Sequence, residues 1–192
     1  IDRGLVGSEM CIRDSPNWAK EWPELYKISE DDAHNLASEF VQYRLKNYQE
    51  NRDFPAGNNT SLLSPYLHFG LITAKHIYFK IIPFLEQKGA DCFLSEIGWR
   101  EFSYHLLYHF PALPYKNFNR KFDNFPWQNN KAQLVKWQKG RTGFPIIDAG
   151  MRQLYQTGWM HNRVRMICAS FLIKNLFCLL YTSDAADDQA CG

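Results

Sequence analysis

The sequence lacks the signatures of several common classes of protein. Its five cysteines show no spacing typical of a zinc site or a disulfide framework, and its six histidines are scattered. No glycine-rich phosphate loop and no Ser–His–Asp pattern is visible. Valine and isoleucine are sparse and never alternate with polar residues over a useful length, so no strand is predicted. We expect an all-α fold without a metal site, in a reducing cytoplasm.

Strong charge and long apolar runs are also missing. The 192 residues carry a formal net charge of only +2, too small by itself to indicate a nucleic-acid partner. No signal peptide or membrane-spanning run is visible, so we expect no membrane partner.

The two ends of the chain differ in character from its middle. Residues 1–15 and 178–192 show no sustained helical period and resemble translated sequencing-adapter read-through. We expect both to be artefactual, the first disordered, and residues 16–177 to form a partial helical domain; ordinary flexible termini are the alternative. Without these ends, 20 of the 22 basic residues and 14 of the 20 acidic residues remain, and the charge of +6 suits a polyanion-binding protein better.

Helix signals run through the middle of the chain. Ser29 precedes three acidic residues and an apolar pattern of helical spacing, and Thr73 is a second candidate N-cap. Ser64 followed by Pro65 is typical of a helix start with Ser64 as the cap. The predicted helices cover about residues 30–51, 64–70, 74–89, 91–111, 132–139, 145–158, and 159 or 160 onward.

Two predicted helices carry chemically mixed faces. Spacings of three, four and seven place Trp159, Asn162, Arg163 and Met166 on one face. A ring, an amide, a guanidinium and a thioether there favour a pocket for a flat ligand attached to phosphates. An amphipathic helix with a basic solvent side is the alternative.

The second mixed face has the same spacing. It carries Glu96, Trp99, Arg100 and Ser103, and it suits a ligand whose polar edge bonds to a carboxylate and whose phosphate pairs with an arginine. A surface Glu96–Arg100 ion pair with Trp99 in the core is the alternative.

Hydroxyl side chains cluster where a loop enters a helix. Thr60, Ser61 and Ser64 lie within five residues of one another. Backbone N–H groups and hydroxyls at such a position can bind a phosphate or pyrophosphate, although an ordinary capping loop has the same composition.

Several ordered motifs together resemble the photolyase/cryptochrome family. They are Tyr48 with Arg52-Asp53-Phe54-Pro55, then TSLLSPYL at 60–67, EIGWREF at 96–102 and the run 140–174. The resemblance covers about residues 48–177 and implies a truncated, all-helical FAD-binding domain. It implies cofactor contacts for Tyr48, Thr60, Ser61, Leu62, Leu63, Ser64, Phe93, Arg100 and Arg165. It implies DNA or substrate contacts for Arg52, Glu96, Trp99, Arg100, Ser103, Asn162, Arg163 and Met166.

The resemblance also implies an activity. Reduced FAD, excited by light, passes an electron to a pyrimidine dimer flipped out of DNA, and the cyclobutane ring splits. Glu96 and Asn162 would act on the dimer, and Trp127 would be the outermost tryptophan of an electron-transfer chain. Asn162 and Met166 resemble the class I cyclobutane-dimer photolyases, whereas plant cryptochromes have Asp and Val there and (6-4) photolyases have a His pair in this region. A blue-light cryptochrome without repair activity is the alternative, and a cofactor-free helical DNA-binding module is a third.

The chain departs from the family pattern in three places. Phe93 stands where the family has a tryptophan, and the flavin-proximal acidic, asparagine and tryptophan residues that follow Phe177 in the family are replaced by CLLYTS. We also expect this chain to lack the family's N-terminal domain, which would hold a folate or deazaflavin antenna pigment. We therefore expect a monomeric fragment that binds FAD weakly or not at all and repairs no DNA by itself.

Overall fold

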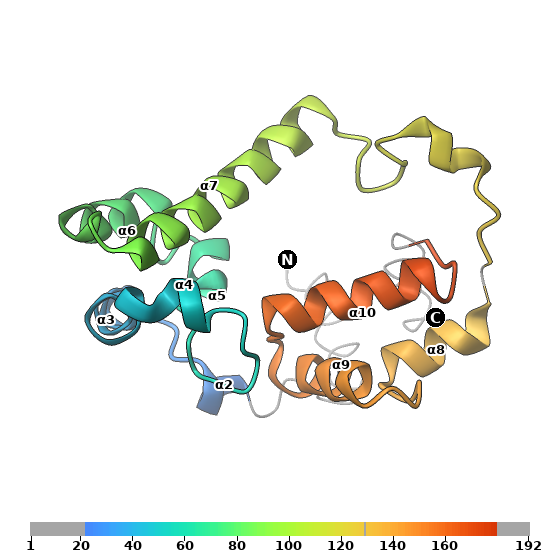
Figure 1. Cartoon of the computed structure of the whole chain (residues 1–192), viewed down its shortest axis with the longest axis horizontal. Helices are drawn as coiled ribbons and strands as arrows, with labels where there is room; N and C mark the ends of the chain where they lie inside the picture. The colour runs from blue at the N-terminus through green and yellow to red at the C-terminus, as the bar shows by residue number, and fades with distance from the viewer. Residues whose placement is uncertain (1–21, 129, 180–192) are drawn as a thin grey trace, which may run out of the picture. The chain divides into compact units, whose positions relative to one another are not determined.

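A computed structural model describes residues 22–128 and 130–179. Within these ranges every regular element is a helix (Figure 1), which confirms the all-α class. None of the described helices combines the length and apolar content needed to cross a bilayer. The predictions for residues 1–15 and 180–192 lie outside the described residues. The helices form two compact units, one over residues 27–116 and one that joins residues 22–26 to 117–179.

The unit over residues 27–116 is a continuous helical path followed by a loop, three further α-helices and a short 3-10 helix. Its elements are α3 (Glu30–Glu39), the π-helix η1 (Phe40–Arg44), the 3-10 helix η2 (Leu45–Asn47), α4 (Tyr48–Asn51), α5 (Ser64–His68), α6 (Ala74–Ile81), the 3-10 helix η3 (Ile82–Phe84) and α7 (Lys88–His109). Helices α4, α6 and η2 pack against α7.

Two predicted N-caps are confirmed in this unit. The Ser29 hydroxyl accepts a hydrogen bond from the Asp32 N–H at 3.0 Å, and the Thr73 hydroxyl accepts one from the His76 N–H at 3.2 Å. Each satisfies a backbone donor that the first turn of a helix leaves without a partner.

Two predicted helix starts in this unit are wrong. Helix α5 begins at Ser64, so the buried Leu63 occupies the cap position and Pro65 is the second helical residue. The preceding Leu62 has a φ of +57°, which turns the chain before the expected cap. Helix α7 begins at Lys88 rather than near Asp91, because the glycine at 89 lets its first turn lie directly on the Leu45 carbonyl.

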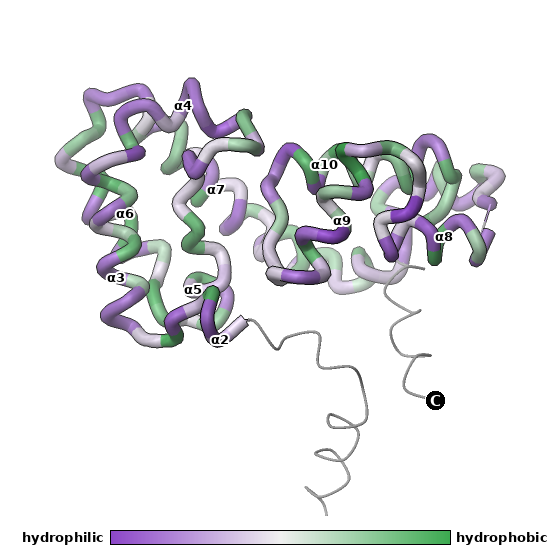
Figure 2. The backbone as a smooth tube through the Cα atoms, turned by 90° about the horizontal axis from the view of Figure 1, so that it is seen from below, coloured by the Kyte–Doolittle hydropathy of each residue, from purple (hydrophilic) through white to green (hydrophobic). Residues whose placement is uncertain are grey.

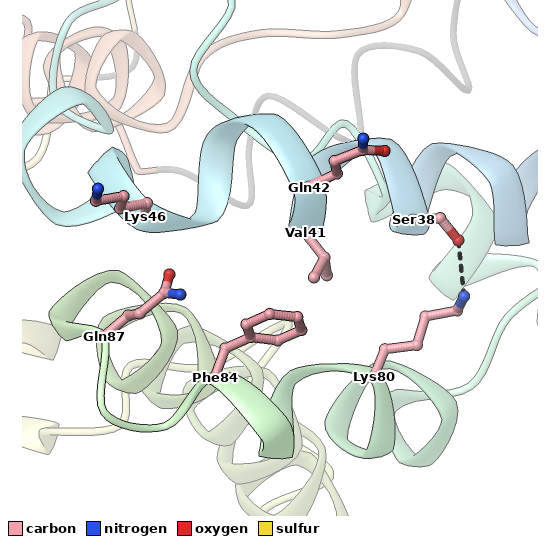
Figure 3. Close-up of a pocket in the computed structure, with 7 residues that line it drawn as sticks. All are labelled: Ser38, Val41, Gln42, Lys46, Lys80, Phe84 and Gln87. Carbon is pink, nitrogen blue, oxygen red and sulfur yellow. Dashed lines mark hydrogen bonds between the residues drawn. The ribbon is translucent and has the colours of Figure 1, made fainter.

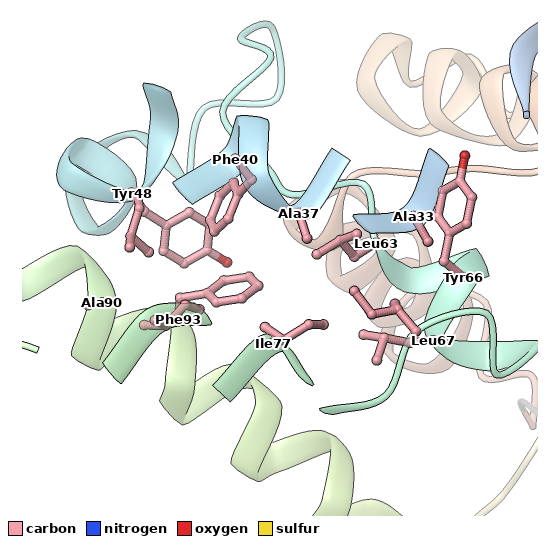
Figure 4. Close-up of a cluster of buried hydrophobic side chains, with 13 residues drawn as sticks. Ala33, Ala37, Phe40, Tyr48, Leu63, Tyr66, Leu67, Ile77, Ala90 and Phe93 are labelled. Atoms are coloured by element: carbon pink, nitrogen blue, oxygen red, sulfur yellow. The ribbon is translucent and has the colours of Figure 1, made fainter. Parts of the chain in front are cut away.

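Three aromatic rings occupy the core of this unit (Figure 4). The Phe40 and Phe93 ring centroids lie 4.5 Å apart, and the Tyr48 ring meets both rings nearly edge-on at 5.5 and 5.2 Å. Such edge-to-face contacts add to the free energy of burying the rings. Aliphatic side chains including Leu63, Ile77 and Ile81 complete the cluster.

The other unit contains α2 (Trp22–Leu25), the 3-10 helix η4 (Arg120–Asn124), α8 (Lys131–Gln138), α9 (Pro145–Thr157) and α10 (Asn162–Lys174). Helix α9 packs against α8 and α10. Both hydrophobic and hydrophilic residues occur along α9 and α10 (Figure 2), as expected for helices with one buried face and one exposed face. The buried faces bring together Trp137, Ile147, Met151, Val164 and Leu172.

The predicted limits of α9 are confirmed. Pro145 is in its first turn, and Gly158 at its end has a φ of +69°, a conformation that favours glycine. Cys178, in the predicted C-terminal tail, is 3% exposed and packs in this unit's core. The division of the chain at residues 15 and 178 stays a prediction.

Candidate functional site

The segment that carries Thr60, Ser61 and Ser64, which we call the hydroxyl loop, is short and strained. Thr60 and Ser61 are half-buried and Ser64 is exposed. Leu62 adopts the left-handed conformation, which costs a non-glycine residue about 1–2 kcal/mol. Leu63 is 1% exposed, and its N–H donates to the Ser61 hydroxyl at 3.4 Å. A buried leucine thus anchors the loop, while among the described residues the Thr60 and Ser64 hydroxyls have no hydrogen-bond partner.

Arg52 is bound to the mixed helix face that carries Glu96, Trp99, Arg100 and Ser103. Its Nη1 donates to Glu96 Oε1 at 2.5 Å and to Cys92 Sγ at 3.2 Å. The guanidinium also lies over the Tyr48 ring, 5.5 Å from its centroid. Burial lowers the pKa of Arg52, but the hydrogen bonds to Glu96 and Cys92 raise it more, so the guanidinium stays charged.

The structure contradicts the alternative interpretation of this face, a Glu96–Arg100 ion pair with Trp99 in the core. Glu96 pairs with Arg52 rather than with Arg100, and Trp99 is 63% exposed instead of lying in the core. Arg100 donates to Glu101 Oε1 at 2.5 Å and to the Leu67 carbonyl at 3.1 Å, and these contacts hold its guanidinium beside α5.

Ser103 and Trp99 share this helix face, as predicted. The Ser103 hydroxyl donates to the Trp99 carbonyl one turn earlier, at 2.9 Å. The Trp99 ring meets the Phe102 ring edge-on, with 5.8 Å between centroids. An exposed indole on the same helix face as Glu96 and Arg100 could stack on a flat ligand.

Tyr48 and Phe93, predicted to contact a cofactor, lie in the hydrophobic core. Tyr48 is 7% exposed and Phe93 is 4% exposed. Burial raises the pKa of the Tyr48 hydroxyl to about 12, although the positive charge of Arg52 opposes the shift. Tyr48 is therefore neutral at physiological pH.

The mixed face predicted for Trp159, Asn162, Arg163 and Met166 is shorter than predicted. Helix α10 begins at Asn162, so Trp159 precedes it and does not share a helical face with Asn162, Arg163 and Met166. The start is delayed because His161 is the N-cap: its Nδ1 accepts a hydrogen bond from the Arg163 N–H at 3.1 Å. An imidazole cap was not recognisable from the preference for Ser, Thr, Asp and Asn.

The remaining residues of this face lie on the first turns of α10. Asn162 is exposed, and Met166 is 54% exposed. Arg163 Nη1 lies 3.6 Å from Met166 Sδ, and Arg165 Nη2 donates to the Met160 carbonyl at 3.4 Å. An amide, a guanidinium and a thioether are thus grouped on one end of the helix.

Trp127 lies apart from these residues in the sequence, after η4. The indole is half-buried, its Nε1 donates to the Phe122 carbonyl at 3.0 Å, and its ring lies 4.6 Å from the Phe125 ring. Trp127 and the α10 residues belong to the unit of residues 117–179, whereas the hydroxyl loop and the α7 residues belong to the unit of residues 27–116.

Two polar residues that sequence reasoning missed fix the local geometry. Arg44 connects the helical path of residues 30–51 to the hydroxyl loop through hydrogen bonds to Asn58 and Thr60. Asp148, 8% exposed, accepts hydrogen bonds from the N–H groups of Thr142 and Gly143 and from the Thr142 hydroxyl. The Asp148 pattern had a sequence signal, a Thr-Gly turn before a helix start, whereas Arg44 had none.

A hollow of about 440 Å³ lies elsewhere in the unit of residues 27–116 (Figure 3). It is lined by Ser38, Val41, Gln42, Lys46, Lys80, Phe84 and Gln87. Lys80 Nζ donates to the Ser38 hydroxyl at 2.7 Å. None of the predicted site residues lines this hollow.

Comparison with known proteins identifies relatives of this chain. Residues 93–182 match the family model described as the FAD binding domain of DNA photolyase. The chain is 47% identical to a deoxyribodipyrimidine photo-lyase of Agrobacterium fabrum over 164 residues, which are 84% of this chain and 34% of that protein. It is 39% identical to cryptochrome-2 of Arabidopsis thaliana over 169 residues, 83% of this chain and 26% of that protein.

Solved structures give the same picture. A bacterial class III photolyase from Agrobacterium tumefaciens matches with a TM-score of 0.82 and 45% identity, over 88% of this chain and 36% of that one. A cryptochrome from Synechocystis matches with a TM-score of 0.74 and 29% identity, over 80% of this chain and 33% of that one. The chain spans about a third of the length of the relatives it matches. The assignment to class I within the photolyases stays a prediction.

Proposed function

Because the chain belongs to the DNA photolyase family, as part of its FAD-binding domain, we propose that the whole protein repairs cyclobutane pyrimidine dimers in DNA with light. The observation that carries the proposal is the combination of the hydroxyl loop, Glu96 and Asn162 in a chain 47% identical to a deoxyribodipyrimidine photo-lyase.

The residues of the hydroxyl loop fit the pyrophosphate of FAD. Thr60 and Ser64 carry hydroxyls without partners among the described residues, and the left-handed Leu62 turns the backbone between them. Short hydroxyl side chains and N–H groups suit a dianion. We assign the remaining cofactor contacts to Ser61, Leu63, Arg100 and Arg165. Tyr48 and Phe93, which lie in the hydrophobic core, would support the hydroxyl loop and α7 rather than reach far into the cofactor site. When bound in its reduced form, FAD supplies the light-excited electron that splits the cyclobutane ring.

Arginines and an exposed indole would hold the damaged strand. Arg52 and Arg163 can pair with phosphates, which positions DNA without reading its sequence. A dimer stacks and pairs poorly, so it costs less free energy to flip out of the helix than a normal base does. Trp99 would then stack on the flipped dimer, beside Ser103, and the family resemblance assigns a further dimer contact to Met166.

Asn162 and Glu96 would recognise the polar edge of the dimer. The Asn162 amide can both donate to and accept from a pyrimidine edge, whereas an Asp carboxylate can only accept. Glu96 Oε1 is engaged by Arg52, while Oε2 has no partner among the described residues and can accept from a base N–H. The Arg52 contact fixes the Glu96 side chain, so its orientation is set before the dimer arrives.

The other features of the whole protein are carried forward as parts of this proposal. Trp127 would be the outer end of an electron-transfer chain toward the flavin. DNA containing pyrimidine dimers would be the partner, the protein would be a cytoplasmic monomer, and a folate or deazaflavin antenna would bind in an N-terminal domain.

The test is repair by the full-length protein from the same gene. With FAD bound, blue light should restore an ultraviolet-damaged oligonucleotide, and the same sample kept in the dark should not. A flavin-bearing protein that repairs nothing under light would favour a signalling cryptochrome, a function consistent with the 39% identity to cryptochrome-2. A protein without flavin would favour a plain DNA-binding module.

A further inference from the structure

We propose that Arg44 is a positioning residue that holds residues 58–63 in the shape needed by the flavin pyrophosphate. The inference rests on the proposed function of the hydroxyl loop. Arg44 itself is not required to touch the cofactor.

The Arg44 guanidinium bridges a helix and the loop. Its Nη1 donates to Asn58 Oδ1 at 3.2 Å and to the Thr60 carbonyl at 3.0 Å, and its Nη2 donates to Glu39 Oε1 at 3.2 Å. The Arg44 side chain is only 11% exposed. Because a buried charge without partners is costly, these contacts are coupled: loosening the loop would leave the guanidinium without two acceptors.

The π-helix η1 explains why Arg44 can reach the loop. Phe40 and Leu45 are five residues apart and both are fully buried. On a regular α-helix of about 3.6 residues per turn they would lie on different faces. The wide turn, closed by the bond from the Leu45 N–H to the Phe40 carbonyl, keeps both in the core. Arg44, between them, is thereby held against the loop, and π-turns of this kind are frequent at functional sites.

The loop needs support at both of its ends. The left-handed backbone of Leu62 is strained, and such strain persists only where the surroundings fix the backbone. The buried Leu63 fixes the end that enters α5, and Arg44 fixes the other end at Thr60. The Thr60 carbonyl accepts a hydrogen bond from Arg44, and the Thr60 hydroxyl has no partner among the described residues. This is the arrangement of a preformed anion loop.

A lysine could not replace Arg44 fully. The planar guanidinium donates to a side-chain amide, a backbone carbonyl and a carboxylate at once, in a fixed fork. A lysine ammonium is a compact charge on a flexible stem, so it would keep the charge and lose part of the geometry.

Hydrogen exchange on the 192-residue chain tests the support itself. In Arg44→Met we expect peptides that cover residues 58–63 to exchange at least about tenfold faster, with α6 and α7 unchanged. Arg44→Lys should be intermediate. Lys46→Met is the matched control: it removes the same charge two residues further on, at the hollow, and should leave the loop as in the wild type. Unchanged exchange of the loop in Arg44→Met would overturn the proposal.

FAD titration of the full-length protein tests the link to function. Arg44→Met should raise the FAD dissociation constant at least about tenfold, Arg44→Lys by less, and Lys46→Met not at all. A loosened loop with wild-type FAD affinity would overturn the positioning role. Failure of the wild-type protein to bind FAD would contradict the proposed function instead, and the exchange result would still decide whether Arg44 holds the loop.

Discussion

Four neighbours contact the Arg52 guanidinium. They are Asp53 at 3.6 Å, Glu96 at 2.5 Å, Cys92 at 3.2 Å and the Tyr48 ring. A phosphate that approaches Arg52 must therefore share it with Glu96. At this scale the proposed substrate site depends on preset side-chain orientations rather than on free charges, because the partners of a guanidinium decide where its remaining N–H groups point.

In the proposed function, the amide of Asn162 favours repair over signalling. Replacing Asn162 with Ala in the full-length protein should lower the preference for dimer-containing over undamaged DNA about tenfold or more, because a base edge loses its partner at a cost of about 1–3 kcal/mol. Competition binding measures the preference. Asn175→Ala, at the other end of α10, is the matched control, and equal losses in both variants would contradict the role of Asn162.

Tyr48 gives a pH-dependent prediction. Burial raises its pKa from 10.0 to about 12 in the folded chain. The neutral hydroxyl therefore stabilises the fold fully below pH 10, and this contribution falls as the pH rises toward 12. This rise in pKa corresponds to about 2–3 kcal/mol of stability. Denaturant unfolding of the wild type and Tyr48→Phe between pH 8 and 12 should show a steeper loss in the wild type; parallel curves would refute the burial of this hydroxyl.

At the scale of the elements, the approach of α7 to η2 fixes the face that carries Glu96 and Arg100. A side chain at Gly89 would collide with the backbone carbonyl of Leu45. Backbone cannot move aside as a flexible side chain can, so overpacking at this point displaces one of the two elements. The packing of η2 on α7 also fixes Tyr48 and Arg52, which follow η2 in the chain.

Gly89→Ala should therefore lower the free energy of unfolding by about 1–3 kcal/mol. Gly98→Ala, on the same helix, is the matched control: its Cβ would meet nothing within 4 Å. That substitution should raise stability by up to about 1 kcal/mol through helix propensity. Thermal unfolding of both variants checks the pair, and equal effects would contradict the close contact.

Asp148 ties the loop before α9 to the helix. Burial raises the pKa of this carboxyl, but hydrogen bonds from Thr142 and Gly143 lower it more, so the net pKa is below 3.8. The charged form therefore stabilises the fold above the unfolded-state pKa, and its contribution is lost as the pH falls through the folded-state pKa. Asp148→Asn should flatten the acid side of the stability profile; an unchanged acid limb in unfolding experiments would count against this contact.

The elements also show what the sequence could predict. Caps such as Ser29 and Thr73 and the pair Pro145 and Gly158 are local, so short patterns were sufficient. The π-turn at Phe40–Arg44 could not be predicted, since it arises from the need to bury both Phe40 and Leu45. The Arg52–Glu96 pair likewise joins residues 44 positions apart. Helical spacing suggested Arg100 as the partner of Glu96, because a spacing pattern relates only residues of the same helix.

At the scale of the whole molecule, the predicted site residues are divided between the two compact units. The hydroxyl loop, Arg52, Glu96, Trp99 and Arg100 belong to one unit, and Asn162, Arg163, Arg165, Met166 and Trp127 belong to the other. The family resemblance suggested all of these roles, whereas composition and spacing suggested only two ligand-like helix faces and a possible phosphate-binding loop. The proposed function is therefore assigned to the full-length protein, since this chain spans about a third of the length of its relatives.

The most direct test of this function compares two kinds of ultraviolet damage. The full-length protein with reduced FAD is illuminated with blue light on one oligonucleotide with a single cyclobutane dimer and on another with a single (6-4) photoproduct. Our account predicts complete restoration of the cyclobutane dimer over many turnovers, none in the dark and none of the (6-4) photoproduct. Flavin-loaded protein that leaves the cyclobutane dimer intact under light would contradict it.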